Sequence, residues 1–148
     1  MTCHEVMTSD PVCCVPDDAV AEVAKLMRAQ DVGSVPVVED RDGRRLIGML
    51  TDRDLTVRVI AEGRDPAATQ VRDVMSNNPV TCQAGDVYQE ALRAMGEHQL
   101  RRIPVVDGEG RLAGIIAQAD VATRLAEPST TGAIVEAISE PTPTSQDD

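Results

Sequence analysis

The stretch GMLTDRDL, at residues 48–55, holds the side chains whose types and spacing are best suited to chemistry. A hydroxyl at Thr51 is followed three residues later by the carboxylate of Asp54, where an apolar segment turns polar. Two interpretations are open. The pair could be a capping box, in which each side chain accepts a hydrogen bond from a backbone N–H at a helix start. Alternatively, the same two groups could bind a ligand.

The composition narrows the class of ligand. The chain has 148 residues, a formal net charge of −11 and one lysine, Lys25. It contains no Phe, no Trp and one Tyr, so single-stranded nucleic acid would lack the aromatic surfaces on which bases stack. The acidic surface also repels polyanions. We therefore expect no nucleic-acid partner, and we expect contacts to a small anion to come from arginine, whose guanidinium suits phosphate.

The chain shows no sequence typical of export or of a membrane. Its first residues, MTCHEVMTSDP, lack the apolar core of a signal peptide, and no apolar run approaches the roughly 18 residues that cross a bilayer. We therefore expect a cytoplasmic protein without a membrane partner. In that compartment the four cysteines are expected to be reduced thiols: Cys3, Cys13, Cys14 and Cys82.

An internal duplication organises the chain. Sliding the sequence by 68 residues aligns residues 6–38 with residues 74–106 without a gap, and 11 of the 33 aligned positions are identical. After a two-residue shift, LIGMLTDRDL at 46–55 aligns with LAGIIAQADV at 112–121. The motif around Thr51 and Asp54 therefore has a counterpart, in which Ala117 replaces the hydroxyl and Asp120 keeps the carboxylate.

The sequence of each copy predicts the same order of helices and strands. A short strand near residues 12–14 or 80–82 precedes a helix at about 19–30 or 87–98, whose apolar residues recur at helical spacing. Two strands joined by a tight turn follow, and the Thr/Ala-x-x-Asp segment begins a second helix. The expected fold is α/β, with two pseudo-symmetric β-α-β-β-α units packed as one module.

These motifs resemble the CBS domain. The resemblance rests on MTSDPV and MSNNPV at the start of each copy, on VPVVED and IPVVDG, and on GMLTDRDL. It implies a first CBS domain at 1–62, a linker at 63–70, a second CBS domain at 71–126, and a short helix with a disordered tail at 127–148. Small proteins made of a lone CBS pair exist, and the chain resembles those of the hypoxic-response-protein type.

The resemblance implies a regulatory module without catalysis. Such pairs bind an adenosyl ligand (AMP, ADP, ATP or S-adenosylmethionine) in clefts between the copies, and they commonly form homodimers. Ligand-dependent conformational change would then be read by another protein, which the sequence does not identify. The chain also lacks the P-loop, H-E-x-x-H and G-x-S-x-G motifs of common enzymes.

Carried over residue by residue, the resemblance implies one complete site. The Asp54 carboxylate would accept hydrogen bonds from a ribose diol, the Thr51 hydroxyl would meet phosphate, and Arg101 and Arg102 would add charge-assisted bonds. The full set expected in this first cleft is Gly48, Met49, Leu50, Thr51, Asp52, Arg53, Asp54, Val80, Arg101 and Arg102. The second cleft would use residues 117–120, including Asp120, with Met7, Val12, Gly33 and Ser34. Because it lacks the hydroxyl and the arginines, we expect it to be weak or empty.

Three alternatives stay open. Thr51 and Asp54 could act only as a capping box, and the arginine pair could be a solvated or salt-bridged pair in an acidic protein. The third is a structural or metal-linked stress protein with vestigial clefts, since Cys3 and His4 precede Cys13 and Cys14 and zinc takes such ligands. Neighbouring residues on a strand point to opposite faces, however, so the last two would not easily share an ion, and we expect no metal.

Overall fold

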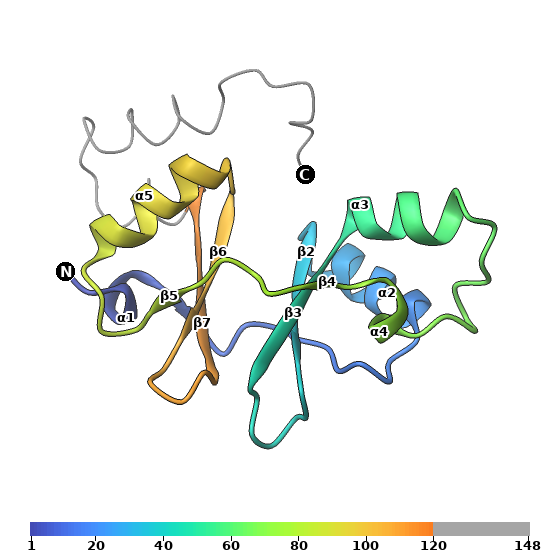
Figure 1. Ribbon diagram of the computed structural model, residues 1–148, viewed down its shortest axis with the longest axis horizontal. Coiled ribbons are helices and arrows are strands. Elements are labelled where there is room, and N and C mark those ends of the chain that lie inside the picture. Colours follow the sequence, from blue (N-terminus) through green and yellow to red (C-terminus); the bar gives the residue numbers. More distant parts are fainter. Residues whose placement is uncertain (120–148) are drawn as a thin grey trace. The chain divides into compact units, whose positions relative to one another are not determined.

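The computed structural model describes residues 1–119, which fall into two compact units (Figure 1). We call Val12–Pro79 the central unit, because residues of the other unit flank it in the sequence, and we call Met1–Pro11 together with residues 80–119 the outer unit. Asp120 and the short helix and tail expected at 127–148 lie outside the described residues. The α/β class with two copies of one unit is confirmed.

The central unit is built on a three-stranded antiparallel sheet. Its strands, in the order β2-β3-β4, are Ser34–Val38, Leu46–Thr51 and Ser76–Asn77. Two longer helical segments accompany the sheet: α2 at Val20–Gln30, and α3 at Asp52–Asp54, which continues as the π-helix η1 at Leu55–Ile60. The short helix α4 at Val71–Val74 immediately precedes β4.

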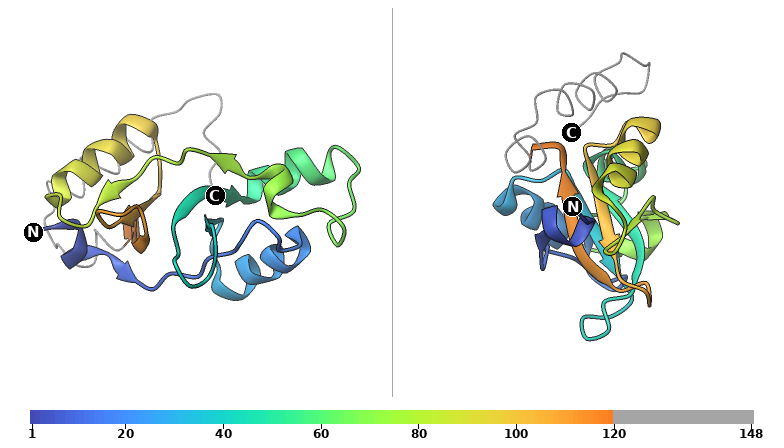
Figure 2. Two further views of the ribbon diagram at one scale, coloured as in Figure 1. Left: turned by 60° about the horizontal axis from the view of Figure 1, so that its bottom comes forward. Right: turned by 90° about the vertical axis from the view of Figure 1, so that its left-hand side faces the viewer.

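The outer unit repeats this plan around a four-stranded sheet. The strand order is β1-β7-β6-β5, from Thr8–Ser9, Leu112–Ala117, Arg102–Val106 and Cys82–Gln83. Helix α5 at Tyr88–His98 connects the parallel strands β5 and β6 and lies along the sheet in the views of Figures 1 and 2. Helix α1 at Cys3–Val6 completes the described part of the unit.

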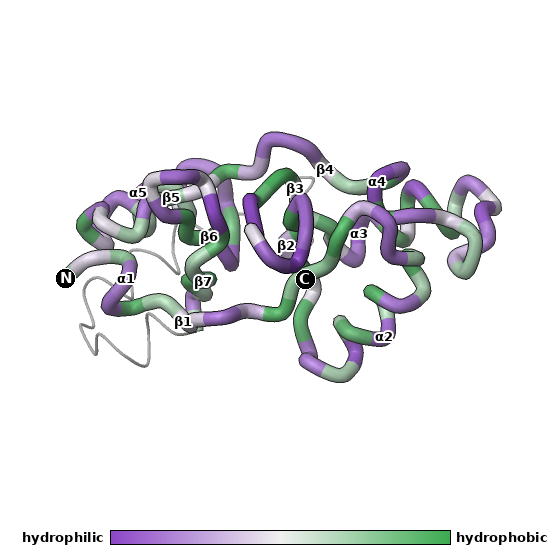
Figure 3. The backbone as a smooth tube through the Cα atoms, turned by 90° about the horizontal axis from the view of Figure 1, so that it is seen from below, coloured by the Kyte–Doolittle hydropathy of each residue, from purple (hydrophilic) through white to green (hydrophobic). Residues whose placement is uncertain are grey.

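The two long helices follow the predicted spacing almost to the residue. In α2, Val20, Val23 and Met27 are buried, three or four residues apart, and the tube alternates between hydrophilic and hydrophobic colours in Figure 3. The helix ends where Asp31 adopts a left-handed conformation, with φ 55°. Helix α5 ends in the same way at Gln99, with φ 54°.

The segment that begins each sequence copy packs in the unit formed mainly by the other copy. Helix α4 and strand β4 begin the second sequence copy, yet they pack in the central unit, whereas α1 and β1 from the first copy pack in the outer unit. Val71 and Val74 of α4 are 0% and 1% exposed in the central core. Burial of these two apolar side chains is the physical reason for the exchange.

Two of the predicted elements differ in the structure. The strand expected near residues 12–14 is wrong, because that segment contributes only one isolated parallel bridge, from Cys14 to Val37. The helix expected after Thr51 is an α-helical turn that widens into a π-helix. None of the helices within residues 1–119 is both long and apolar enough to span a membrane.

Candidate functional site

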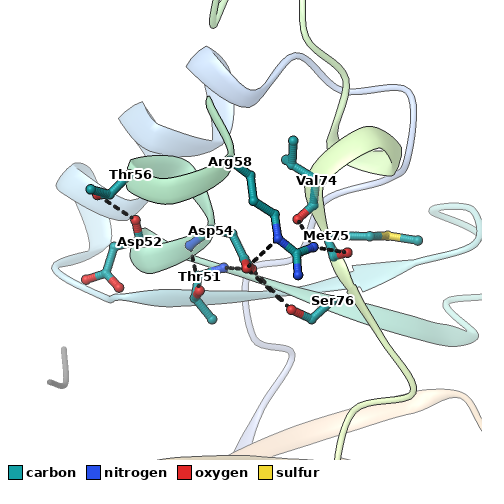
Figure 4. Close-up of polar contacts among 8 residues, drawn as sticks. All are labelled: Thr51, Asp52, Asp54, Thr56, Arg58, Val74, Met75 and Ser76. Carbon is teal, nitrogen blue, oxygen red and sulfur yellow. Dashed lines mark hydrogen bonds and ion pairs between the residues drawn. The ribbon is translucent and has the colours of Figure 1, made fainter. Parts of the chain in front are cut away.

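Thr51 and Asp54 form a complete capping box at the junction of β3 and α3. The Thr51 hydroxyl accepts a hydrogen bond from the Asp54 backbone N–H at 3.1 Å, and the Asp54 carboxylate accepts one from the Thr51 N–H at 3.0 Å (Figure 4). The capping interpretation is therefore confirmed as geometry. It does not exclude a ligand, because the Thr51 hydroxyl still has its own proton to donate.

The Asp54 carboxylate is unusually enclosed for a capping residue. Asp54 is only 8% exposed, and a buried charge is costly unless partners replace the lost water. Besides the Thr51 N–H, the carboxylate faces the Ser76 hydroxyl, at 3.4 and 3.5 Å from its two oxygens, and Arg58 Nε at 4.0 Å (Figure 4). These contacts come from β3, β4 and η1, so three elements fix the carboxylate.

Arg58 is itself held in place from the opposite side. Its Nη1 donates to the carbonyl oxygens of Val74 and Met75 at 3.1 and 3.3 Å. The guanidinium therefore lies between Asp54 and the segment that leads from α4 into β4 (Figure 4). Asp54, Ser76 and Arg58 form a polar cluster that ties this segment to the helix after β3.

The carboxylate retains capacity for further hydrogen bonds. An ionised carboxylate has about four acceptor positions, whereas the Thr51 N–H makes the one short bond and the Ser76 and Arg58 contacts are long. Two neighbouring hydroxyls of a ligand could therefore replace the long Ser76 contact without breaking the capping box. A fixed carboxylate of this kind suits a cis-diol.

The expected site residues on β3 have different structural roles. Leu50 is 0% exposed and belongs to the central core, so its side chain packs rather than faces solvent. A Cβ on Gly48 would lie 2.7 Å from the Ser76 carbonyl oxygen, so glycine allows β3 and β4 to approach closely. Met49, between Gly48 and Leu50 on β3, pairs in register with Ser76 and is partly exposed.

The remaining expected residues are distributed over both units. Asp52 and Arg53 are exposed on the first turn after Thr51. Val80, Arg101 and Arg102 belong to the outer unit, so their participation in a site with Thr51 stays a prediction. Arg102 is the first residue of β6 and pairs in register with Ala117.

The outer unit's counterpart of the motif is less polar where the structure describes it. Ala117, which replaces Thr51, is buried and offers no hydroxyl. Repeat alignment places Thr8 at the position of Ser76, and Thr8 is exposed on β1. Asp120, the counterpart of Asp54, lies beyond residue 119.

Ser76 and Arg58 are the polar groups that sequence reasoning missed. Ser76 is part of the MSNNPV signature, which marks the start of the second copy but does not show that this segment packs against the first. Arg58 lies four residues after Asp54, the spacing of an acid–base pair on one helix face. That spacing was a usable signal.

The cysteines do not form an evident metal centre. Within residues 1–119, no group of three or more His, Cys, Asp or Glu side chains is arranged to hold a metal ion. All four cysteines are free, and burial raises the pKa of the Cys14 thiol to about 12. Burial also raises the pKa of Cys3 and of Cys82, so without a metal ion these thiols stay protonated at neutral pH.

Comparisons with known proteins agree with the repeat. The CBS domain family model matches residues 3–60 and 71–127. Hypoxic response protein 1 of Mycobacterium tuberculosis is 36% identical over 126 residues, which cover 85% of this chain and 86% of the relative.

Solved structures give the same result. The crystal structure of Hypoxic Response Protein I with two coordinated zinc ions matches with a TM-score of 0.75 and 35% identity, over 84% of this chain and 98% of that one. The crystal structure of Arabidopsis thaliana CBSX2 in complex with AMP matches with a TM-score of 0.73 and 25% identity, over 86% and 98% of the two chains.

Proposed function

Because the chain belongs to the CBS domain family, with two copies of the domain, we propose that it is a regulatory module that binds an adenosyl ligand and carries out no catalysis. The observation that carries the proposal is the Asp54 carboxylate, enclosed and fixed by Thr51, Ser76 and Arg58 yet with acceptor capacity left over. A carboxylate in such a position accepts hydrogen bonds from a ribose diol.

The rest of the ligand would be held by both copies. The AMP complex of the similar protein CBSX2 supports an adenine nucleotide, and the family's S-adenosylmethionine ligands are the other candidates. In this proposal the Thr51 hydroxyl, Arg101 and Arg102 contact phosphate, while Val80 and Met49 contribute to the apolar walls around adenine. The second site, at Ala117 and Asp120, is weak or empty because it lacks the hydroxyl.

The mechanism in this proposal is a conformational change. A ligand that touches both copies shifts their arrangement only by the difference in its affinity for the two states. A homodimer, expected from the family resemblance, would pass that shift to a separate regulated protein whose identity is unknown.

A thermal-shift panel tests the proposal. Wild type, Asp54→Asn and Asp73→Asn would be melted with AMP, ADP, ATP and S-adenosylmethionine. Asp73 is the matched control, because its carboxylate completes the capping box of α4 by accepting the Gln70 N–H at 3.3 Å. A ligand at about 100 times its Kd stabilises by about 2.7 kcal/mol.

We expect at least one ligand to raise the Tm of wild type and of Asp73→Asn, but not of Asp54→Asn. If no ligand raises the Tm of wild type, or if Asp54→Asn responds as wild type does, the proposal is wrong.

A metal-linked structural protein is the second candidate, favoured by the two zinc ions in the crystal structure of Hypoxic Response Protein I. Elemental analysis of protein purified without chelator tests it. Stoichiometric zinc together with an absence of ligand response would move this candidate ahead of the nucleotide sensor.

A further inference from the structure

Arg58 is a cation fixed next to the carboxylate at the centre of the candidate site. Two carbonyl oxygens, of Val74 and Met75, hold its Nη1, and its Nε lies 4.0 Å from Asp54 Oδ1 (Figure 4). An arginine side chain is usually free to sample many rotamers, and these bonds restrict it. The positive charge is therefore positioned in advance of any ligand.

The positive charge of Arg58 affects whether the site can bind a ligand that carries a phosphate. Asp54 alone would place an enclosed negative charge where the ligand docks, in a protein whose net charge is already −11. A phosphate approaching it would be repelled, and more strongly than in bulk water because the carboxylate is 8% exposed. Arg58, whose Nε lies 4.0 Å from Asp54 Oδ1 and whose side chain is 53% exposed, offsets part of this charge. The neighbouring Asp52 and Arg53 are exposed and of opposite sign.

We propose that Arg58 is the residue that allows the Asp54 site to accept phosphate-bearing adenosyl ligands as well as uncharged ones. This inference rests on the proposed function. It assigns Arg58 a role in ligand selection through Asp54. A purely structural role, in which Arg58 only ties η1 to the segment before β4, would affect charged and uncharged ligands equally.

Calorimetric titration with AMP and with adenosine separates the two roles, because both ligands have the same diol and base but only AMP has the phosphate. The variants are Arg58→Gln, which removes the charge, and Arg58→Lys, which keeps it. Arg64→Gln is the matched control, since it removes one positive charge from the same unit, where Arg64 pairs with Asp73 at 3.5 Å instead of with Asp54.

We expect Arg58→Gln to weaken AMP binding by about tenfold and adenosine binding by less than about threefold, as expected for loss of one partly screened charge interaction. Arg58→Lys would recover most of the AMP affinity, and Arg64→Gln would bind both ligands like wild type. In wild type, added salt would lower the preference for AMP over adenosine.

Equal weakening of AMP and adenosine in Arg58→Gln would overturn the selective role and leave the proposed function standing. If wild type binds neither AMP nor adenosine, this inference is wrong. The proposed function falls with it only if ADP, ATP and S-adenosylmethionine also fail to bind.

Discussion

The two units share one scaffold but differ in polar groups at the same strand ends. In the central unit, Thr51 at the end of β3 pairs in register with Ser34 at the start of β2. In the outer unit, Ala117 of β7 pairs with Arg102 of β6. One copy thus has hydroxyls where the other has an alanine and an arginine. The difference teaches that the duplicated fold has been kept while its polar groups have diverged, as specialisation for one ligand site would require.

The shared scaffold depends on one glycine in each unit. Replacing either glycine by alanine should lower the free energy of unfolding more than any other substitution considered below. A Cβ on Gly48 would lie 2.7 Å from the Ser76 carbonyl oxygen, and one on Gly114 would lie 2.7 Å from the Thr8 carbonyl oxygen. Because backbone cannot yield easily, we expect Gly48→Ala and Gly114→Ala each to cost about 2–4 kcal/mol of unfolding free energy.

Urea titration measures this cost, with Gly85→Ala as the control because a Cβ there meets no atom within 4 Å. If only one of the two variants, Gly48→Ala or Gly114→Ala, lowers the free energy of unfolding, the two scaffolds are not equivalent.

The equivalent cysteines Cys14 and Cys82 test whether the two cores respond alike to high pH. Burial raises the pKa of Cys14 from 9.0 to about 12. Because the folded state holds this proton more tightly, the stabilisation is complete below pH 9 and is lost as the pH rises from 9 to 12. We expect Cys14 to account for about 3 kcal/mol of lost stability by pH 11.

The measurement is the free energy of unfolding between pH 8 and 11 for wild type, Cys14→Ala and Cys82→Ala, since burial raises the pKa of Cys82 as well. Each variant should lose less stability with pH than wild type. Identical slopes in all three proteins would show that the thiols do not titrate as described.

Removal of the Ser76 hydroxyl should change stability and ligand affinity the least. Its contacts to Asp54 are 3.4 and 3.5 Å, at the long end for a hydrogen bond. We expect Ser76→Ala to reduce the free energy of unfolding by about 0.5 kcal/mol and to change ligand affinity by less than about threefold. A large loss of affinity would mean that Ser76 contacts the ligand itself, which would sharpen the contrast with Thr8 in the outer unit.

The fold was largely predictable because its signals are local. The helical spacing of Val20, Val23 and Met27 and the capping pattern at Thr51 and Asp54 lie within short windows of sequence, and the duplication is visible when the chain is aligned with itself. The exchange of α1 and α4 between the units was not predictable in this way, since it depends on which core buries Val71 and Val74.

The candidate site likewise has residues that local sequence spacing predicts and residues that only long-range packing brings to it. Thr51 and Asp54 were found from spacing, whereas Ser76 reaches Asp54 across 22 residues of sequence and only through the exchange. Arg58 could have been found from its i,i+4 spacing to Asp54, but its fixed position comes from the carbonyl oxygens of Val74 and Met75, which no sequence pattern shows.

The most direct test of the central claim is the stoichiometry of ligand binding per chain. Calorimetric titration with AMP should show one binding step at one ligand per chain in wild type, the same step in Asp73→Asn, and no step in Asp54→Asn. Two equal steps in wild type would contradict the specialisation of the central unit. Unchanged binding in Asp54→Asn would contradict the assignment of the site to Asp54.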